Sequence, residues 1–355
     1  MPGCCELPRD IVTEAEASAT PAVAPRRTVL KGAAAIAGLL AAAGGGRTGV
    51  AQARQVKLAF CSQLLCVVPY EVARAGGHFA AEGLEVELVY TRGGNAAMQA
   101  LVGGAVDYAA TSLEVAIQAF AQGADIRRFA TTGRLPLFAL ATAPGVAGEV
   151  VELKDLEGRT IGISALGNAD HALALYLLER AGADTGSVEF ATLGPNLLEA
   201  LRLGQVDAGM VQEPALSLLQ EGGARVLVNG MDAEDAREHL GGDYEFMGVA
   251  VRTPEIEQRR EEMSALARAL ASALQAMRAT GAEELIAALP AELVAGGDTA
   301  VLEAALARYK DSLYPTGTAI DLAATRRVAE TLRVAGLLAP DVDPTPLFDT
   351  SIAGG

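Results

Sequence analysis

The chain of 355 residues contains two copies of one pattern, spaced 100 residues apart. Residues 101–126 align without a gap on residues 201–226, and both copies contain Gly-x-Val-Asp, a strand-like run, a helix-like run and Gly-Ala. A composition rich in Ala, Leu and Gly inflates such matches, but an ordered match of this kind indicates a repeated supersecondary unit. The chain is therefore expected to fold into two similar lobes.

Short β-rich runs alternate with helical segments, which favours an α/β fold with mostly parallel sheets. The predicted strands cover residues 56–61, 84–90, 107–110, 126–131 and 137–142, and then 159–164, 188–192, 207–211 and 225–229. The predicted helices between them cover residues 95–102, 114–122, 170–180, 197–203 and 214–220. From about residue 254 the chain has the composition of long helices with no further strand, which predicts a helical covering rather than a third domain.

Two segments have the character of connections between the lobes. Residues 134–143 lead out of the first lobe and residues 243–252 lead back, and glycine-containing turns flank both. Glycine gives such turns the backbone freedom that a hinge requires. We expect lobe one to comprise residues 54–138 and 249–355, with the C-terminal helices packing back on it, and lobe two to comprise residues 139–248.

Residues 1–53 are predicted to be an export signal that is removed. The pair Arg26-Arg27 precedes an apolar stretch at 32–43 that is too short to span a bilayer, and Ala51-Gln52-Ala53 has the small-x-small pattern of a signal peptidase site. The mature chain then begins at Arg54. The arginine pair favours a twin-arginine signal, with a general secretory signal as the alternative because the flanking residues depart from the twin-arginine pattern.

Acidic residues outnumber basic residues by 44 to 28, so the formal net charge is −16. This balance argues against nucleic acid and anionic membrane surfaces as partners. The apolar stretch of the signal is not followed by a small residue and a cysteine that would take a lipid. We therefore predict a freely soluble exported protein with no direct membrane insertion.

Two cysteines of the mature chain, Cys61 and Cys66, lie close together after the first predicted strand. In an oxidising compartment they form either a small-loop disulfide or two buried thiols, and the sequence leaves both open. The three histidines lie too far apart in the sequence to indicate a metal site. Because none of the common phosphate-binding, zinc-protease, nucleophile-elbow or dinucleotide motifs is present in the mature chain, we predict no catalytic residues and no cofactor.

Several segments together resemble a known family. They are residues 70–90 (YEVARAGGHFAAEGLEVELVY), Gly93-Gly94-Asn95, residues 153–163 (LKDLEGRTIGI) and residues 204–214 (GQVDAGMVQEP). This ordered set resembles the nitrate/sulfonate/taurine-type periplasmic solute-binding proteins of ABC importers, and the pyrimidine-precursor-binding proteins of thiamin salvage share the framework. The resemblance covers roughly residues 56–252.

The resemblance implies a two-lobed type II periplasmic binding protein fold that closes on a small ligand like a clamshell. It also implies a monomer that delivers its ligand to a membrane permease. The alternative that the sequence leaves open is an enzyme of cofactor biosynthesis on the same fold.

Ligands of open α/β sheets bind at the carboxyl ends of strands, where loops lead into helix N-termini. The polar and small residues predicted to bind the ligand are Ser62, Gln63, Gly94, Asn95, Thr111 and Ser112 in lobe one, and Ser164, Asn168, His171, Gln212, Glu213 and Tyr244. Ser112 and Gln212 correspond in the repeat and are expected to face each other across the cleft. For each residue singly, ordinary helix capping or core packing is the competing interpretation.

We rank a small sulfonate, nitrate-like or carboxylate anion slightly ahead of a pyrimidine or another neutral heterocycle. Helix N-termini bind oxyanions without Lys or Arg, which suits an acidic protein. If Glu213 points into the cleft, it instead favours a ligand with an amine or aminopyrimidine group.

Overall fold

The structure is a computed structural model that describes residues 53–61, 64–294 and 299–353. The predicted export signal, up to residue 52, and the candidate residues Ser62 and Gln63 therefore lie outside the described residues. The described residues belong to one compact unit, Val50–Gly355. Among them, no helix combines the length and the apolar character that crossing a bilayer requires.

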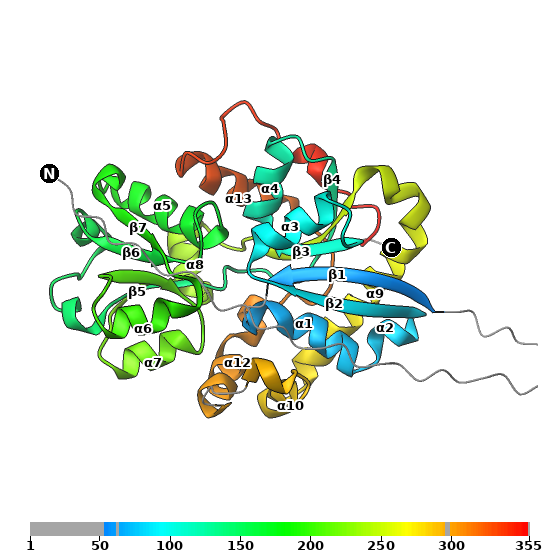
Figure 1. Ribbon diagram of the computed structural model, residues 1–355, viewed down its shortest axis with the longest axis horizontal. Coiled ribbons are helices and arrows are strands. Elements are labelled where there is room, and N and C mark those ends of the chain that lie inside the picture. Colours follow the sequence, from blue (N-terminus) through cyan, green and yellow to red (C-terminus); the bar gives the residue numbers. More distant parts are fainter. Residues whose placement is uncertain (1–52, 62–63, 295–298, 354–355) are drawn as a thin grey trace, which may run out of the picture. The chain divides into compact units, whose positions relative to one another are not determined.

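The first five-stranded sheet has the order β2-β1-β3-β10-β4 (Figure 1). Its strands are β1 (Arg54–Cys61), β2 (Leu84–Thr91), β3 (Tyr108–Ser112), β4 (Ile126–Thr131) and β10 (Met247–Arg252). β1 pairs in parallel with β2 and β3, whereas β10 runs antiparallel to both β3 and β4. We call the part of the molecule built on this sheet lobe one.

The second five-stranded sheet has the order β7-β6-β8-β5-β9. Its strands are β5 (Ala139–Thr142), β6 (Thr160–Ile163), β7 (Glu189–Thr192), β8 (Ala208–Val211) and β9 (Val226–Asn229). β6 pairs in parallel with β7 and β8, and β5 runs antiparallel to β8 and β9. The two sheets thus have the same topology, and the strands that follow the two Gly-x-Val-Asp motifs, β3 and β8, hold the same central place. The predicted pair of similar lobes is confirmed.

The chain exchanges strands between the lobes. β5 follows β4 in sequence but belongs to the second sheet, and β10 follows β9 but returns to the first. The connecting segments are hydrogen bonded to each other, since Tyr244 N donates to Arg134 O at 2.9 Å and Phe246 N donates to Gly133 O at 2.9 Å. The segment 243–252 was predicted only as a connection. In the structure it also supplies strand β10, whose apolar residues are buried in the sheet.

Helices cover both faces of each sheet (Figure 1). Those that follow the strands of lobe one are α1 (Leu64–Ala75), α2 (His78–Ala81), α3 (Gly94–Val102) and α4 (Leu113–Ala121). Those of lobe two are α5 (Ala169–Ala181), α6 (Leu197–Arg202), α7 (Ala215–Glu221) and α8 (Ala233–Leu240).

The C-terminal helices are α9 (Ile256–Ala279), α10 (Ala282–Ala287), α11 (Ala291–Val294), α12 (Thr299–Leu313) and α13 (Leu322–Val334). α9 packs on α1 and α2 of lobe one, as predicted. α13, however, contacts α5 of lobe two as well as α4 of lobe one, and α12 contacts α7. The C-terminal helices therefore bridge the two lobes in addition to covering the first.

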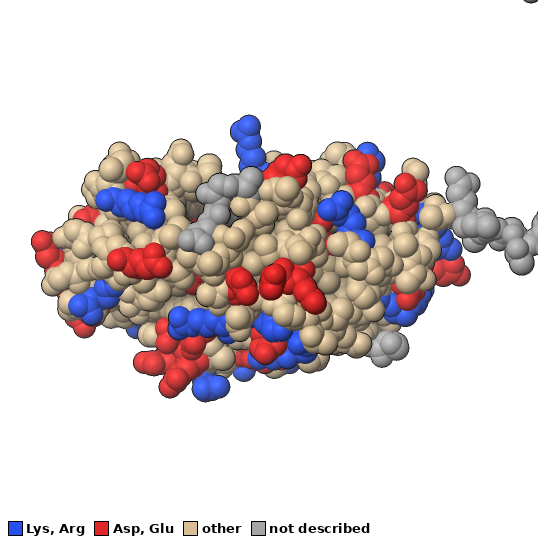
Figure 2. All heavy atoms as spheres, turned by 90° about the horizontal axis from the view of Figure 1, so that it is seen from below, with Lys and Arg blue, Asp and Glu red and all other residues tan. Residues whose placement is uncertain are grey.

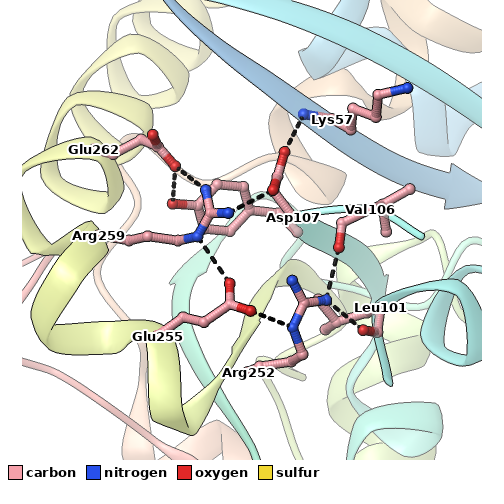
Figure 3. Close-up of polar contacts among 9 residues, drawn as sticks. Lys57, Leu101, Val106, Asp107, Arg252, Glu255, Arg259 and Glu262 are labelled. Atoms are coloured by element: carbon pink, nitrogen blue, oxygen red, sulfur yellow. Dashed lines mark hydrogen bonds and ion pairs between the residues drawn. The ribbon is translucent and has the colours of Figure 1, made fainter. Parts of the chain in front are cut away.

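The aspartates of the two repeated motifs perform the same structural task. Asp107 accepts hydrogen bonds from Lys57 N at 2.8 Å and from Arg259 Nη2 at 2.6 Å (Figure 3). Asp207 accepts from Thr160 N at 2.9 Å and from Arg159 Nη1 at 3.2 Å. Each carboxylate thus ties one parallel strand, β1 or β6, to the loop before the central strand, β3 or β8, so the repeated motif stabilises the sheet of each lobe.

The arginine at Asp107 belongs to a larger ion-pair network, in which Arg259 also meets Glu255 and Glu262 at 2.8 and 2.6 Å (Figure 3). Elsewhere the charges are mixed as well. Figure 2 shows one face on which acidic and basic side chains are interspersed among neutral residues. On that face the coloured residues form no continuous basic surface of the kind that binds nucleic acid.

Candidate functional site

A cavity lies where residues of both lobes meet, at the carboxyl ends of their parallel strands. Its lining comprises Cys61, Cys66, Arg92, Gly93, Gly94, Thr111, Ser112 and Val115 from lobe one, Ser164, Asn168, Ala169 and Asp170 from lobe two, and Phe138, Phe246 and Met247 at the connections. The volume is about 30 Å³, enough for water but not for an organic ligand. The cavity therefore has to widen before a ligand of several heavy atoms enters.

Five of the predicted ligand-binding residues line this cavity: Gly94, Thr111, Ser112, Ser164 and Asn168. On the lobe-one side, Ser112 caps α4, because its Oγ accepts a hydrogen bond from Val115 N at 3.5 Å. The neighbouring Thr111 is 1% exposed, and its Oγ1 has no hydrogen-bond partner among the described residues. A buried hydroxyl is expected to have a partner, so Thr111 Oγ1 is available to a ligand.

Gly94 begins α3 at the wall of the cavity. A Cβ at this position would lie 3.3 Å from Val115 Cγ2, so the absence of a side chain keeps the cavity open here. The start of α3 leaves backbone N–H groups without helical partners, which favours an electron-rich ligand atom nearby.

On the lobe-two side, three side chains form a hydrogen-bonded chain. Asp170 is fully buried, and its Oδ1 accepts from Ser164 Oγ at 2.8 Å while its Oδ2 accepts from Ser164 N. Asn168 Nδ2 donates to Ser164 Oγ at 3.0 Å. Asn168 is 8% exposed, and its Oδ1 has no partner among the described residues. Burial raises the pKa of the Asp170 carboxyl, and the hydrogen bonds from Ser164 oppose that rise.

The other described candidates, Asn95, His171, Gln212, Glu213 and Tyr244, do not appear among the residues that line this cavity. Asn95 lies in a separate depression with Gln118 and Gly167. Gln212 and Glu213 lie in another, which shares Ser164 and Phe138 with the central cavity. Ser112 and Gln212 thus lie in neighbouring hollows and do not line one cavity together.

Glu213, His171 and Tyr244 have local partners in this structure. Both Glu213 oxygens accept from Ser217, from its N at 3.0 Å and its Oγ at 3.1 Å, which stabilises the first turn of α7. His171 Nδ1 accepts from Gly167 N at 3.1 Å, and burial lowers the pKa of its imidazole. Tyr244 is fully buried and donates from its hydroxyl to Glu114 Oε1 at 2.9 Å.

Cys61 and Cys66 are both buried, and no disulfide joins them. Of the two alternatives that the sequence left open, the structure shows two thiols. Burial, first of all, raises the pKa of Cys66 well above its usual value. Cys66 therefore presents neutral sulfur to the cavity wall rather than a reactive thiolate.

A buried charged group that was not predicted from the sequence lies behind the cavity. Arg128 is fully buried and donates from Nη1 to Thr111 O at 3.1 Å and from Nη2 to Phe246 O at 2.9 Å. It faces Glu114 and Glu245, and burial raises the pKa of each of these carboxyls to about 7. Nothing in the sequence distinguishes Arg128 from an exposed strand arginine, because its partners come from distant segments.

Arg92 was also missed, although the sequence holds a signal for it. It directly follows β2 at the carboxyl end of that strand, which is the rule that identified the other loops. Among the described residues, no group of three or more His, Cys, Asp or Glu is placed to hold a metal ion.

Comparisons with solved structures show the same fold. A protein of Bordetella bronchiseptica RB50 is 26% identical with a TM-score of 0.75, over 84% of this chain and 95% of that one. The alkanesulfonate-binding protein SsuA from Xanthomonas axonopodis pv. citri, bound to MOPS, is 23% identical with a TM-score of 0.63, over 84% and 99%. The periplasmic nitrate-binding protein NrtA from Synechocystis PCC 6803 is 15% identical with a TM-score of 0.63, over 85% and 87%.

These structures confirm the two-lobed periplasmic binding protein fold that the sequence resemblance implied. A search of curated proteins found no match to the chain. The family model described as NMT1/THI5 like matches residues 66–283, which include most of both sheets and the start of the C-terminal helices. The chain belongs to the NMT1/THI5-like family.

Proposed function

We propose that the chain is the solute-binding component of an ABC importer, which captures a small ligand between its lobes and delivers it to a membrane permease. The observation that carries this proposal is the cavity shared by the lobes. Each lobe lines it with a residue that has a buried polar atom without a hydrogen-bond partner among the described residues, Thr111 with Oγ1 and Asn168 with Oδ1. The alkanesulfonate- and nitrate-binding proteins of similar fold support it.

Closure of the lobes explains the small cavity. Gln118 in α4 donates from Nε2 to Gly167 O of lobe two at 2.9 Å, so one direct hydrogen bond fastens the lobes beside the cavity. The paired connecting segments supply the hinge. A ligand enters when the lobes separate, and its contacts with both lobes then favour the closed state.

The ligand-binding residues of this proposal are Gly94, Thr111, Ser112, Ser164 and Asn168. Of the remaining predicted residues, Asn95, Gln212 and Glu213 keep a proposed role at the edge of the opened cleft. Ser62, Gln63, His171 and Tyr244 stay further candidate ligand contacts of the proposal. The ligand classes are a small sulfonate, nitrate-like or carboxylate anion, and a pyrimidine-like molecule such as a thiamin precursor.

The proposal also includes export through the twin-arginine-like signal of residues 1–53, an extracytoplasmic location and a monomeric state. The lobe boundaries stay as predicted, with lobe one at 54–138 and 249–355 and lobe two at 139–248.

The test is a thermal-shift screen of the protein from Arg54 onward, because a ligand that binds only the folded state raises the melting temperature. The ligands are sulfonates, nitrate, carboxylates, pyrimidines and vitamins. The blocking variant is Gly94→Val, which places a side chain at the cavity wall. Its control is Gly145→Val, because a Cβ at Gly145 meets no atom within 4 Å.

We expect one ligand class to raise the melting temperature saturably in the wild type and in Gly145→Val, and not to raise it in Gly94→Val. A rise that survives Gly94→Val would place binding elsewhere. Chemical conversion of a ligand would favour the alternative enzyme of cofactor biosynthesis.

A further inference from the structure

Asp170, Ser164 and Asn168 are linked by hydrogen bonds, and the charge of Asp170 determines which group donates and which accepts in each of them. An ionised carboxylate only accepts hydrogen bonds. Because Asp170 is fully buried, leaving Oδ1 without a donor would be costly, so the hydroxyl hydrogen of Ser164 is committed to Asp170.

This commitment determines how Asn168 is oriented. With its hydrogen given to Asp170, Ser164 Oγ offers only a lone pair to its other neighbour. Asn168 therefore has to approach with its NH₂ group, and its Nδ2 does so at 3.0 Å. The amide is planar, so the carbonyl oxygen is left on the other side, where it has no partner among the described residues.

We propose that Asp170 is a positioning residue which, through Ser164, holds Asn168 with its Oδ1 turned to the ligand as a hydrogen-bond acceptor. The inference rests on the proposed function and refines its ligand class. The ligand carries an N–H or O–H donor where it meets lobe two. An electron-rich atom of the same ligand meets the N–H groups at the start of α3.

The other polar atom of the lining without a hydrogen-bond partner among the described residues does not impose this choice. Thr111 Oγ1 is a hydroxyl and can donate or accept. Asn168 is thus the residue that separates a ligand with a donor from one with acceptors alone. A bare oxyanion with no N–H or O–H would leave Asn168 Oδ1 unsatisfied on closure.

Asp170→Asn should reverse the direction of the chain while keeping its shape. The new amide accepts from Ser164 N with its oxygen and donates to Ser164 Oγ with its nitrogen. The Ser164 hydroxyl then donates to Asn168, whose amide turns to present Nδ2 to the cavity. In Ser164→Ala the connection is cut, and Asp170 no longer acts on Asn168.

The direct readout is NMR of protein labelled with ¹⁵N at asparagine, from Arg54 onward and without ligand. The chain has four asparagines, at positions 95, 168, 196 and 229. The spectrum therefore contains one pair of side-chain NH₂ resonances, called an amide pair, for each of these four residues. Asn168→Asp identifies the Asn168 pair by its loss. Because Asp170→Asn adds a fifth pair, Asn168→Asp is also made in the Asp170→Asn background to identify the Asn168 pair there. The pairs of the other three asparagines report whether a variant keeps the native fold.

We expect Asp170→Asn to shift the Asn168 pair strongly and to leave the other three in place. In the Ser164→Ala background the same substitution should have no further effect on that pair. The inference is overturned if Asp170→Asn leaves the Asn168 pair unchanged, or if the shift is equal with and without Ser164. Ser164→Ala alone is the second test, since it should move the Asn168 pair even if Asp170→Asn does not fold.

Acetamide and acetone then test the donor requirement, because they have similar shapes and only acetamide has N–H groups. We expect the wild type to bind acetamide about tenfold more tightly than acetone, as read from the Asn168 pair, and Asp170→Asn to lose this preference. Equal effects of the two probes, or no effect of either, would refute the donor requirement. Failure of the proposed function would appear separately, in the thermal-shift screen, and would leave the ligand-free amide result unchanged.

Discussion

Asp107 and Asp207 occupy equivalent positions in the two lobes. Replacing each by alanine measures whether they contribute equally to the free energy of unfolding. Asp107→Ala removes the acceptor of the Lys57 N–H and one of the carboxylates around Arg259. A hydrogen bond to a charged group contributes about 1.5–3 kcal/mol, and an ion pair with both side chains partly exposed adds about 0.2–1 kcal/mol. We expect each variant to lose about 2–4 kcal/mol of its free energy of unfolding.

The assay is urea unfolding followed by circular dichroism, with the slope of the transition checked for constancy. The control is Asp125→Ala, because Asp125 is 66% exposed and lies 4.0 Å from Arg127, so its loss should be below about 0.5 kcal/mol. A loss below about 0.5 kcal/mol in Asp107→Ala or Asp207→Ala would show that the repeated motif does not stabilise the lobes as described.

Three further predictions concern the closure of the lobes, the buried thiols and the pH dependence of stability. Gln118→Ala removes the hydrogen bond to Gly167 O, which contributes about 1 kcal/mol to lobe closure. Small-angle X-ray scattering of the ligand-free variant should therefore show lobes that are further apart on average. An unchanged scattering profile would contradict the role of this hydrogen bond in closure. Cys61 and Cys66 should react with a thiol reagent slowly in the native protein and rapidly in denaturant, and fast native labelling would show that the cavity wall is exposed. Burial raises the pKa of Glu114 from 4.5 to about 7, so the Glu114 carboxyl binds its proton more tightly in the folded state than in the unfolded state. Its contribution to stability is fully present below pH 4.5 and is lost as the pH rises through 7. Glu114→Gln should therefore flatten the decline in unfolding free energy between those values, by at most about 3 kcal/mol, and an equally steep decline in the variant would refute the assignment.

Apart from β10, which was predicted only as part of a connection, the strands were predictable to within a residue or two because periodicity and turn residues are local signals. The strand 126–131 was predicted with the bounds of β4. The repeat added the topology, since β3 and β8 both follow a Gly-x-Val-Asp motif. The position of α13 against both lobes was not predictable, because no local pattern says which surface an amphipathic helix will cover.

The site was predictable only as a place at the sheet edges. Ser164 and Asn168 reach the cavity, whereas Glu213 and His171 are held by their own loops. The sequence presents all four as polar residues near helix starts. Which of them turns inward depends on hydrogen-bond partners that only the folded chain brings together.

The central claim is that the chain binds one small molecule between its lobes and returns it unchanged. The most direct measurement is equilibrium dialysis of the protein, from Arg54 onward, against the ligand class that raises its melting temperature, followed by denaturation and mass spectrometry of the released molecule. We expect one ligand bound per chain, recovered chemically unchanged, with binding lost in Gly94→Val and kept in Gly145→Val. Recovery of a converted product, or full binding by Gly94→Val, would contradict it.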